Sequence, residues 1–203
     1  SCKEIISAIQ KQLTTLPMAS PKADFKLKED VTNKLISLLN LDGKIFYTIS
    51  GAESIENALK IARQIKKKQV IVARNKSYHG ATLGALSLTG DWRNKEHETI
   101  DDWTLRVLEP CDDPDASLAI EAMEKLGIDK IAAICLETIT GGNGVFEASQ
   151  VWWDNISKFC KTKNIFLILD EVICGFYRTG KAFGFQHYNL KPDFIALSKS
   201  ISG

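Results

Sequence analysis

The sequence has no closely spaced pair of cysteines, almost no net charge and no long hydrophobic run, and each absence excludes a class of protein. Its five cysteines are odd in number, scattered and without any CxxC pair, which argues against a zinc site and against a disulfide framework. The net charge of +1 gives no general attraction to nucleic acids or membrane surfaces. No apolar run approaches the roughly 20 residues of a membrane-spanning helix. We therefore expect a globular protein without a metal, a nucleic-acid partner or a membrane segment.

Length and composition suit a folded unit that is part of a longer protein. The chain has 203 residues, 44% of them hydrophobic, and a chain of this size buries roughly 70% of its unfolded surface. It lacks an initial methionine and opens directly on a helical pattern without a signal peptide, so we expect a fragment. Unpaired thiols favour a reducing compartment. We expect a cytoplasmic protein, or a mitochondrial one if a targeting peptide precedes Ser1.

Short apolar runs alternate with helical patterns along the chain. Strands alternating with helices predict an α/β fold, a three-layer α/β/α sandwich with a mainly parallel sheet. The helical patterns cover residues 3–14, 27–39, 116–126 and 149–161, with a further helix following Ser54 and ending in the lysines at 66–68. The runs predicted as strands are 44–49, 69–73, 105–108, 131–136, 165–169 and 194–197.

The last two predicted strands end in residues that carry chemistry. The run 165–169 stops at Asp170 and Glu171, and the run 194–197 is followed by Ser198 and Lys199. Ligands of open α/β sheets bind outside the carboxyl ends of the strands. A lysine that forms a Schiff base with pyridoxal phosphate, beside an acid that pairs with the pyridinium nitrogen, is one chemistry that needs this pair. The alternative is an acid that caps the next helix and a solvated lysine.

A small-residue turn, Ser50-Gly51-Ala52, lies between a predicted strand and a predicted helix. Backbone N–H groups at such a helix start form a site for a phosphate, and they need small residues more than particular side chains. The turn has neither the P-loop nor the dinucleotide-binding spacing. A plain tight turn with Ser50 as the N-cap remains the alternative.

Three further residues are candidates to surround a planar ligand. Tyr78 follows a strand and precedes a glycine, so its ring could stack on the ligand or simply pack at the sheet edge. We expect His79 to have a supporting role, tuning a neighbour or satisfying a buried hydrogen bond. Val172 lies two residues after Asp170, and both side chains point to one side if the chain stays extended. Val172 would then support the second face of the ring.

Five segments together resemble the class III (omega) aminotransferases, pyridoxal-phosphate enzymes of fold type I. The similarity covers essentially the whole chain. It is carried by LILDEVICGFYRTG and PDFIALSKSISG near the C-terminus, and by SGAESIENALKIAR, SYHGATLGALSLTG and ETITGGNGV before them.

The resemblance implies a role for each candidate residue. Lys199 would be the Schiff-base lysine and Asp170 the partner of the pyridinium nitrogen. Gly51 and Ala52 would bind phosphate, Tyr78 and Val172 would sandwich the ring with His79 nearby, and Glu137 would lie near the active site in a role that the sequence leaves open.

The resemblance also implies an organisation. Residues 1–43 would be a helical lead-in, and residues 44–203 the pyridoxal-phosphate-binding large domain, truncated at its C-terminal side. A small C-terminal domain would be absent, and a phosphate-contacting threonine from the partner subunit of a homodimer would lie beyond Gly203. We expect the fragment alone to be inactive.

Three positions depart from the family pattern. Ala52 replaces the usual Ser or Thr, Thr138 replaces a proline, and Gly142 replaces a second glutamate that in many members gates a substrate-binding arginine. The last departure favours an enzyme that moves an amino group from an amine or omega-amino acid to an oxo acid such as pyruvate. The alternatives are an aminomutase, racemase or decarboxylase on the same scaffold, or a non-catalytic α/β binding protein.

Overall fold

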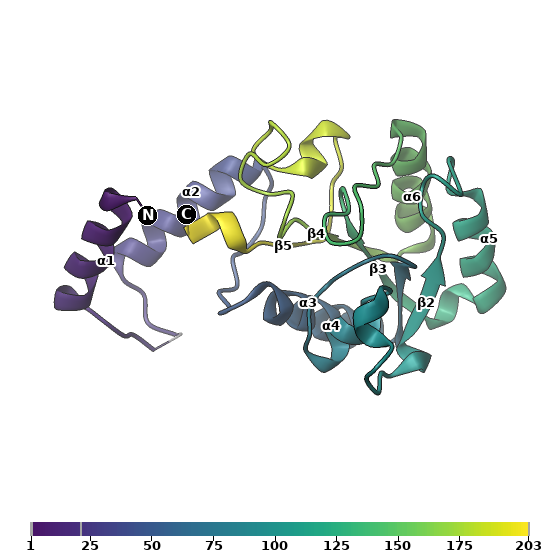
Figure 1. The fold of residues 1–203 in the computed structure, drawn as a ribbon, viewed down its shortest axis with the longest axis horizontal. Coiled ribbons are helices and arrows are strands. Elements are labelled where there is room, and N and C mark those ends of the chain that lie inside the picture. Colours follow the sequence, from purple (N-terminus) through teal and green to yellow (C-terminus); the bar gives the residue numbers. More distant parts are fainter. Residues whose placement is uncertain (1, 21, 203) are drawn as a thin grey trace.

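One sheet of five parallel strands forms the centre of the molecule (Figure 1). The structure is a computed structural model that describes residues 2–20 and 22–202. The strand order is β2-β1-β3-β4-β5, and each strand begins and ends within a single residue of a predicted run. The strands are β1 (Val70–Arg74), β2 (Thr104–Val107), β3 (Ile131–Glu137), β4 (Phe166–Asp170) and β5 (Phe194–Ala196).

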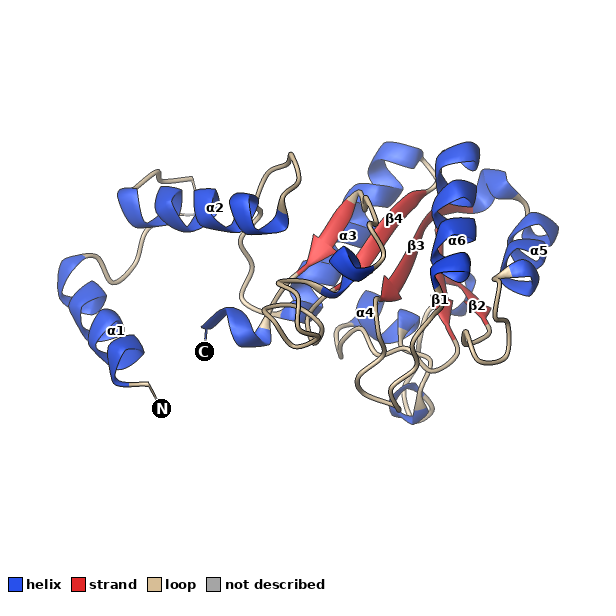
Figure 2. Cartoon of the chain, turned by 90° about the horizontal axis from the view of Figure 1, so that it is seen from above, coloured by secondary structure: helices blue, strands red, loops and turns tan. Residues whose placement is uncertain are grey.

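Helices cover both faces of this sheet (Figure 2). Helices α3 (Gly51–Lys66) and α4 (Leu83–Leu88) pack on one face, and α5 (Ser117–Leu126) and α6 (Gln150–Lys163) pack on the other. Successive residues of a strand point to opposite faces, and the strands supply both hydrophobic cores in this way. The predicted three-layer α/β/α sandwich is confirmed.

The central strand shows why this sequence forms a buried parallel strand. All seven residues of β3 are buried, which an unbroken apolar run permits because neither face has to meet water. Ile134 and Leu136 belong to the core under α5 and α6, whereas Ala133 and Cys135 belong to the core under α3 and α4. The carboxyl ends of β1, β3, β4 and β5 therefore meet along one edge of the sheet.

Two helices at the start of the chain lie to one side of the sandwich (Figure 1). The first, α1 (Lys3–Thr15), has no buried residue, although its apolar residues share a face as predicted. The second, α2 (Lys26–Leu39), reaches the main core through Leu39. The division into a lead-in of residues 1–43 and a large domain of residues 44–203 stays a prediction, and both Ser1 and Gly203 lie outside the described residues. No helix in the described part of the chain has the length and apolar character to span a membrane.

The strand predicted at residues 44–49 is wrong. This segment is irregular in the structure and joins no ladder. Phe46 and Ile49 are exposed, while the Tyr47 hydroxyl bonds Thr32 Oγ1 of α2 at 2.8 Å. A hollow of about 470 Å³ separates the segment from β5. A strand needs a neighbouring strand about 4.8 Å away. The β-forming residues of this run therefore do not suffice to make it a strand.

Two other segments contain more structure than the sequence predicts. The small-residue stretch after Gly80 forms the short helix α4. The predicted loop 90–102 contains the 3₁₀ turn Trp92–Asn94 and the start of a second, Asp101–Trp103. Further 3₁₀ turns are Ile128–Lys130, Gly184–His187 and Lys199–Ser202.

Candidate functional site

The turn before α3 presents backbone donors at one end of the sheet edge. Ser50 caps the helix by accepting the Glu53 N–H at 3.1 Å, and the Glu53 carboxylate in return accepts the Ile49 N–H at 2.8 Å. Ser50 is thus the N-cap of α3, the feature that the plain-turn alternative names, while phosphate binding at this turn stays a prediction. The N–H groups of Gly51 and Ala52 have no hydrogen-bond partner within the described residues. Together with the positive end of the helix dipole, they make the start of α3 a suitable place for an anion.

Two glycines allow three segments of the edge to come into contact. A Cβ atom on Gly51 would lie 2.8 Å from Val172 Cγ2 and 3.4 Å from Ser198 Cβ. A Cβ atom on Gly80 would lie 2.6 Å from Ala52 Cβ, and Gly80 also has a φ of +136°. The turn at 50–52 is thus packed between the loop after β1 on one side and the loops after β4 and β5 on the other.

Asp170 and His79 form a buried pair beneath this edge. His79 Nδ1 lies 2.8 Å from Asp170 Oδ2, and the two residues are 3% and 4% exposed. The second carboxylate oxygen accepts the Val172 N–H at 3.1 Å. Burial lowers the His79 pKa, but Cys135 and the Asp170 carboxylate outweigh it and hold that pKa well above its ordinary value. The raised pKa favours an imidazole that donates from Nδ1 to the carboxylate, and the supporting role of His79 stays a prediction.

The Glu137 carboxylate joins two loops of the edge. Oε1 accepts the Tyr78 N–H and Oε2 accepts the Gly141 N–H, both at 3.1 Å. Burial raises the pKa of the Glu137 carboxyl, while the charge of His79 and these two donors oppose that rise. The glycine loop also touches Tyr78 directly, since a Cβ atom on Gly142 would lie 3.4 Å from Tyr78 Cβ. Glu137 thus fixes where Tyr78 stands, a geometry that the sequence does not reveal.

Two arginines belong to this region and were missed. Arg74 is fully buried at the end of β1, where its Nη2 donates to the Glu137 carbonyl at 2.6 Å. Its position directly after an apolar run is the feature of the sequence that could have identified it. Arg93 stands with its Cζ 4.6 Å from the centre of the Tyr78 ring. Nothing in the spacing of the polar loop 90–102 marks Arg93.

The neighbouring acid, Glu171, points away from the Asp170 pair. Its carboxylate accepts hydrogen bonds from the Thr138 hydroxyl and from the N–H groups of Gly184 and Phe185. Glu171 is fully buried, and burial raises its pKa against the effect of these three donors. Thr138, which departs from the family pattern, is therefore tied to Glu171, and this acid serves the loop that follows β4.

Lys199 follows β5 on the α3 side of the edge. It borders the hollow of about 470 Å³ together with Ser50 and Ser54, and its φ of +47° is in the left-handed region. Asp170 is paired with Ala196 across the β4–β5 ladder, but it does not line that hollow. The structure thus places both groups at the carboxyl ends of adjacent strands, with Val172 packed against Gly51 and Ser198 beside them.

Comparison with known proteins identifies the family. The sequence profile described as aminotransferase class-III matches residues 2–203. The chain belongs to the class-III aminotransferases. It is 35% identical over 209 residues to acetylornithine aminotransferase of Aquifex aeolicus, covering 98% of this chain and 53% of that protein. It is 33% identical over 218 residues to taurine–pyruvate aminotransferase of Rhodobacter capsulatus, covering 98% and 48%.

Solved structures show the same fold. Taurine:2-oxoglutarate aminotransferase from Bifidobacterium kashiwanohense, solved with pyridoxal phosphate and glutamate, matches with a TM-score of 0.89 and 30% identity over 96% of this chain and 48% of that one. A fourfold mutant of a thermostable omega transaminase from Pseudomonas jessenii gives 0.90 and 28% over 99% and 50%. The fold is that of pyridoxal-phosphate transaminases of fold type I, and the family's cofactor is pyridoxal 5′-phosphate. The chain spans about half the length of these relatives.

Proposed function

We propose that the full-length protein is a pyridoxal-phosphate-dependent aminotransferase that moves an amino group from an amine or omega-amino acid to an oxo acid such as pyruvate. One observation carries the proposal: the buried His79–Asp170 pair joins the end of β4 to the loop after β1, and that loop packs through Gly80 against Ala52 at the start of α3. The named relatives are aminotransferases, which favours this reaction over an aminomutase, racemase or decarboxylase. The names of these relatives include two different donors, acetylornithine and taurine. The type of donor that this protein uses is therefore proposed here and does not follow from the family.

The residues of the edge fit the cofactor. The N–H groups of Gly51 and Ala52 would hold its phosphate, and the close packing of both residues supports a site that admits only small side chains. Tyr78 and Val172 would hold the two faces of its ring. Asp170, which pairs with His79, would bind the protonated ring nitrogen, because an opposite charge favours the charged form of that nitrogen.

When bound, the cofactor supplies an electron-withdrawing ring that stabilises negative charge on the substrate carbon. Lys199 is the residue that we propose to anchor it, and the Lys199 amine would then move the proton to and from the substrate carbon as general acid–base. Glu137 would act indirectly, by fixing the Tyr78 backbone against the glycine loop. His79 would orient the Asp170 carboxylate from below.

The assembly and compartment are further parts of the proposal. We propose a homodimer with shared active sites, because the apolar side chains of α1 lie on the surface of this chain. All five cysteines are unpaired, which supports the cytoplasm as the compartment.

The proposal is tested on the full-length protein. Wild type should bind pyridoxal phosphate, show the absorbance of a lysine Schiff base, and convert amine plus pyruvate to carbonyl product plus alanine. Lys199→Ala should lose both the absorbance and turnover, whereas Lys191→Ala, an exposed lysine just before β5, should keep both. Turnover by Lys199→Ala, or failure of the wild type to bind the cofactor, would contradict the proposal.

Asp170→Asn tests the second role. This variant should bind the cofactor but lose about 10²–10³-fold in kcat, the usual effect of removing one electrostatic contact to developing charge. A kcat equal to that of the wild type would remove Asp170 from the mechanism.

A further inference from the structure

The carboxylate of Glu56 joins two helices that pack on the same face of the sheet, and the proposed mechanism does not use it. Glu56 lies on α3, one turn after Ala52, and α4 packs beside α3 (Figure 1). Its Oε1 accepts hydrogen bonds from the Thr82 hydroxyl and the Gly84 N–H, both at 2.7 Å, and from the Ala85 N–H at 3.0 Å. A half-buried acid of α3 thus holds the start of α4.

The start of α4 depends on this carboxylate because α4 has no cap of its own. The first N–H groups of any helix lack a partner within the helix. Thr82 occupies the N-cap position, but its side chain accepts none of these donors. Gly84 gives the carboxylate room, since a Cβ atom there would overlap it and lie 3.0 Å from Glu56 Cδ. The first turn of α4 is therefore built around Glu56.

The far end of α4 is bonded to the residues on both sides of Tyr78. The hydroxyl of Thr89, the residue directly after α4, accepts the His79 N–H at 3.1 Å. The Gly90 N–H donates to the Ser77 carbonyl at 2.9 Å. A shift of α4 therefore moves the backbone that carries Tyr78.

The segment 78–85 meets α3 at two places. Gly80 packs on Ala52 of the 50–52 turn, and the start of α4 is bonded to Glu56. We propose that Glu56 is a positioning residue, which holds the Tyr78 ring at a fixed place relative to the donors of the 50–52 turn. This inference rests on the proposed function, in which the two groups bind the ring and the phosphate of one cofactor. A site whose parts are held in place in advance loses less free energy when the ligand binds.

The first test measures the dissociation constant of pyridoxal phosphate on the full-length protein. Glu56→Ala should raise it about 2- to 12-fold, up to the whole effect of a lost stacking contact. In a Tyr78→Ala protein the same substitution should change nothing further, because Glu56 acts through Tyr78. Glu56→Gln keeps the Oε1 acceptor and should bind the cofactor nearly as the wild type does. Wild-type binding by Glu56→Ala, or an equal loss with and without the Tyr78 ring, would refute the inference.

Ile156→Val is the matched control for stability. Ile156 is buried in the core under α5 and α6, on the opposite face of the sheet from Glu56. The loss of one methylene lowers stability, but it should leave the dissociation constant of the cofactor unchanged. If Ile156→Val weakens cofactor binding as much as Glu56→Ala does, the effect reflects general stability and the positioning role is refuted.

Hydrogen exchange of the cofactor-free protein separates this inference from the proposed function. In Glu56→Ala the amides of His79 and Gly90 should exchange about 10-fold faster than in the wild type, as expected when a bond to a charged group is lost, whereas those of β3 should not change. Faster exchange confined to residues 82–85 would make Glu56 a local cap and refute the inference. A wild type that binds no pyridoxal phosphate would refute the proposed function, while the exchange of His79 and Gly90 still decides the role of Glu56.

Discussion

The imidazole of His79 and the carboxylate of Asp170 are joined at 2.8 Å, although 91 residues separate them in the chain. The contact crosses from the loop after β1 to the end of β4, passing beside Cys135 of β3, which lies between those strands. Because both groups are almost fully buried, the charge of the imidazole depends strongly on the carboxylate beside it. The protonation of His79 therefore affects the stability of the protein.

The first prediction concerns pH. The folded-state pKa of His79 is raised, so the folded protein binds the proton more tightly than the unfolded chain, whose histidines titrate at about 6.5. The stability contributed by the pair is fully present below about pH 6.5 and is lost as the pH rises through the folded pKa. The free energy of urea unfolding of the full-length protein should thus differ most between wild type and His79→Asn at low pH, and the difference should shrink as the pH rises.

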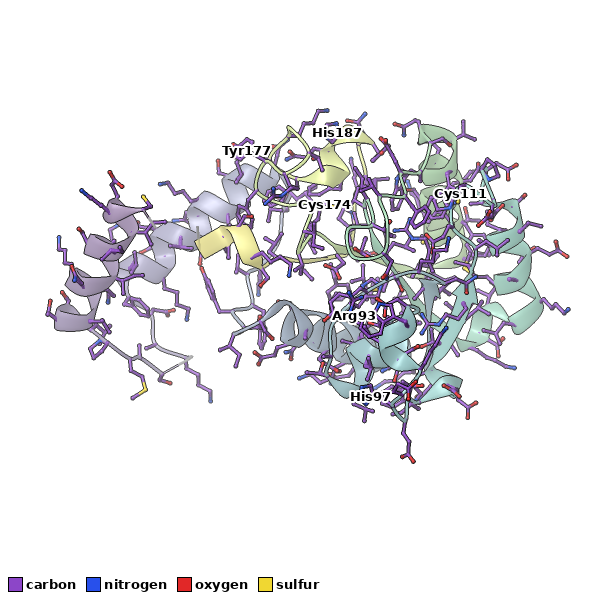
Figure 3. The ribbon with its side chains drawn as sticks, viewed as in Figure 1. Arg93, His97, Cys111, Cys174, Tyr177 and His187 are labelled. Carbon is purple, nitrogen blue, oxygen red and sulfur yellow. The ribbon has the colours of Figure 1, made fainter. Side chains whose placement is uncertain are left out.

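His97 provides the control for that experiment. It lies exposed at the tip of the loop 90–102 (Figure 3), and His97→Asn should follow the wild-type profile throughout. If the difference in unfolding free energy between wild type and His79→Asn does not change with pH, the His79–Asp170 pair is not the source of the pH dependence.

The second prediction concerns Gly80. An alanine there would put its Cβ 2.6 Å from Ala52 Cβ at a φ of +136°, so steric overlap and backbone strain add. We expect Gly80→Ala to cost about 2–4 kcal/mol of unfolding free energy and to weaken cofactor binding, because the 50–52 turn must shift. Gly43→Ala, which meets no atom within 4 Å, should be neutral or stabilising. Equal urea midpoints for the two variants would contradict this prediction, because they would mean that the 50–52 turn can shift without a loss of stability.

The third prediction concerns the link between the two loops at Glu137. Glu137→Gln keeps the shape but has one acceptor oxygen, so one of the N–H groups of Tyr78 and Gly141 loses its partner. Leaving a buried donor unpaired costs about 1–3 kcal/mol, measurable as a lower urea midpoint. Glu124→Gln breaks only a surface ion pair with Lys163 and should cost at most about 1 kcal/mol. A Glu137→Gln protein as stable as the wild type would contradict the linking role.

The sequence predicted the sheet well because β1, β3, β4 and β5 each contain an unbroken apolar run that is followed by a polar residue. Parallel strands buried on both faces leave such runs, and their carboxyl ends locate the ligand edge. The same logic failed at residues 44–49, since an apolar run records a propensity and a ladder also requires a neighbour within hydrogen-bonding distance. No strand of the described sheet lies next to that segment.

The details of the site depend on geometry that no spacing encodes. Asp170 and Glu171 are adjacent acids in the same short segment of sequence. In the structure, however, Asp170 pairs with His79, whereas Glu171 accepts a hydrogen bond from Thr138. Strand alternation explains that they face opposite ways, but it does not say which face carries the site. Arg93 was invisible for a related reason, because its place beside Tyr78 depends on how the loop 90–102 folds back after α4.

The last prediction separates the ring of Tyr78 from its hydroxyl. If the ring stacks on the cofactor, Tyr78→Phe should bind pyridoxal phosphate as the wild type does, whereas Tyr78→Ala should lose a stacking contact worth about 0.5–1.5 kcal/mol. That loss corresponds to roughly a 2- to 12-fold rise in the cofactor dissociation constant, measured by titrating the cofactor absorbance. Phenylalanine preserves the ring face and therefore the stacking contact. A Phe variant as impaired as the Ala variant would mean that the hydroxyl, and not the ring face, makes the contact.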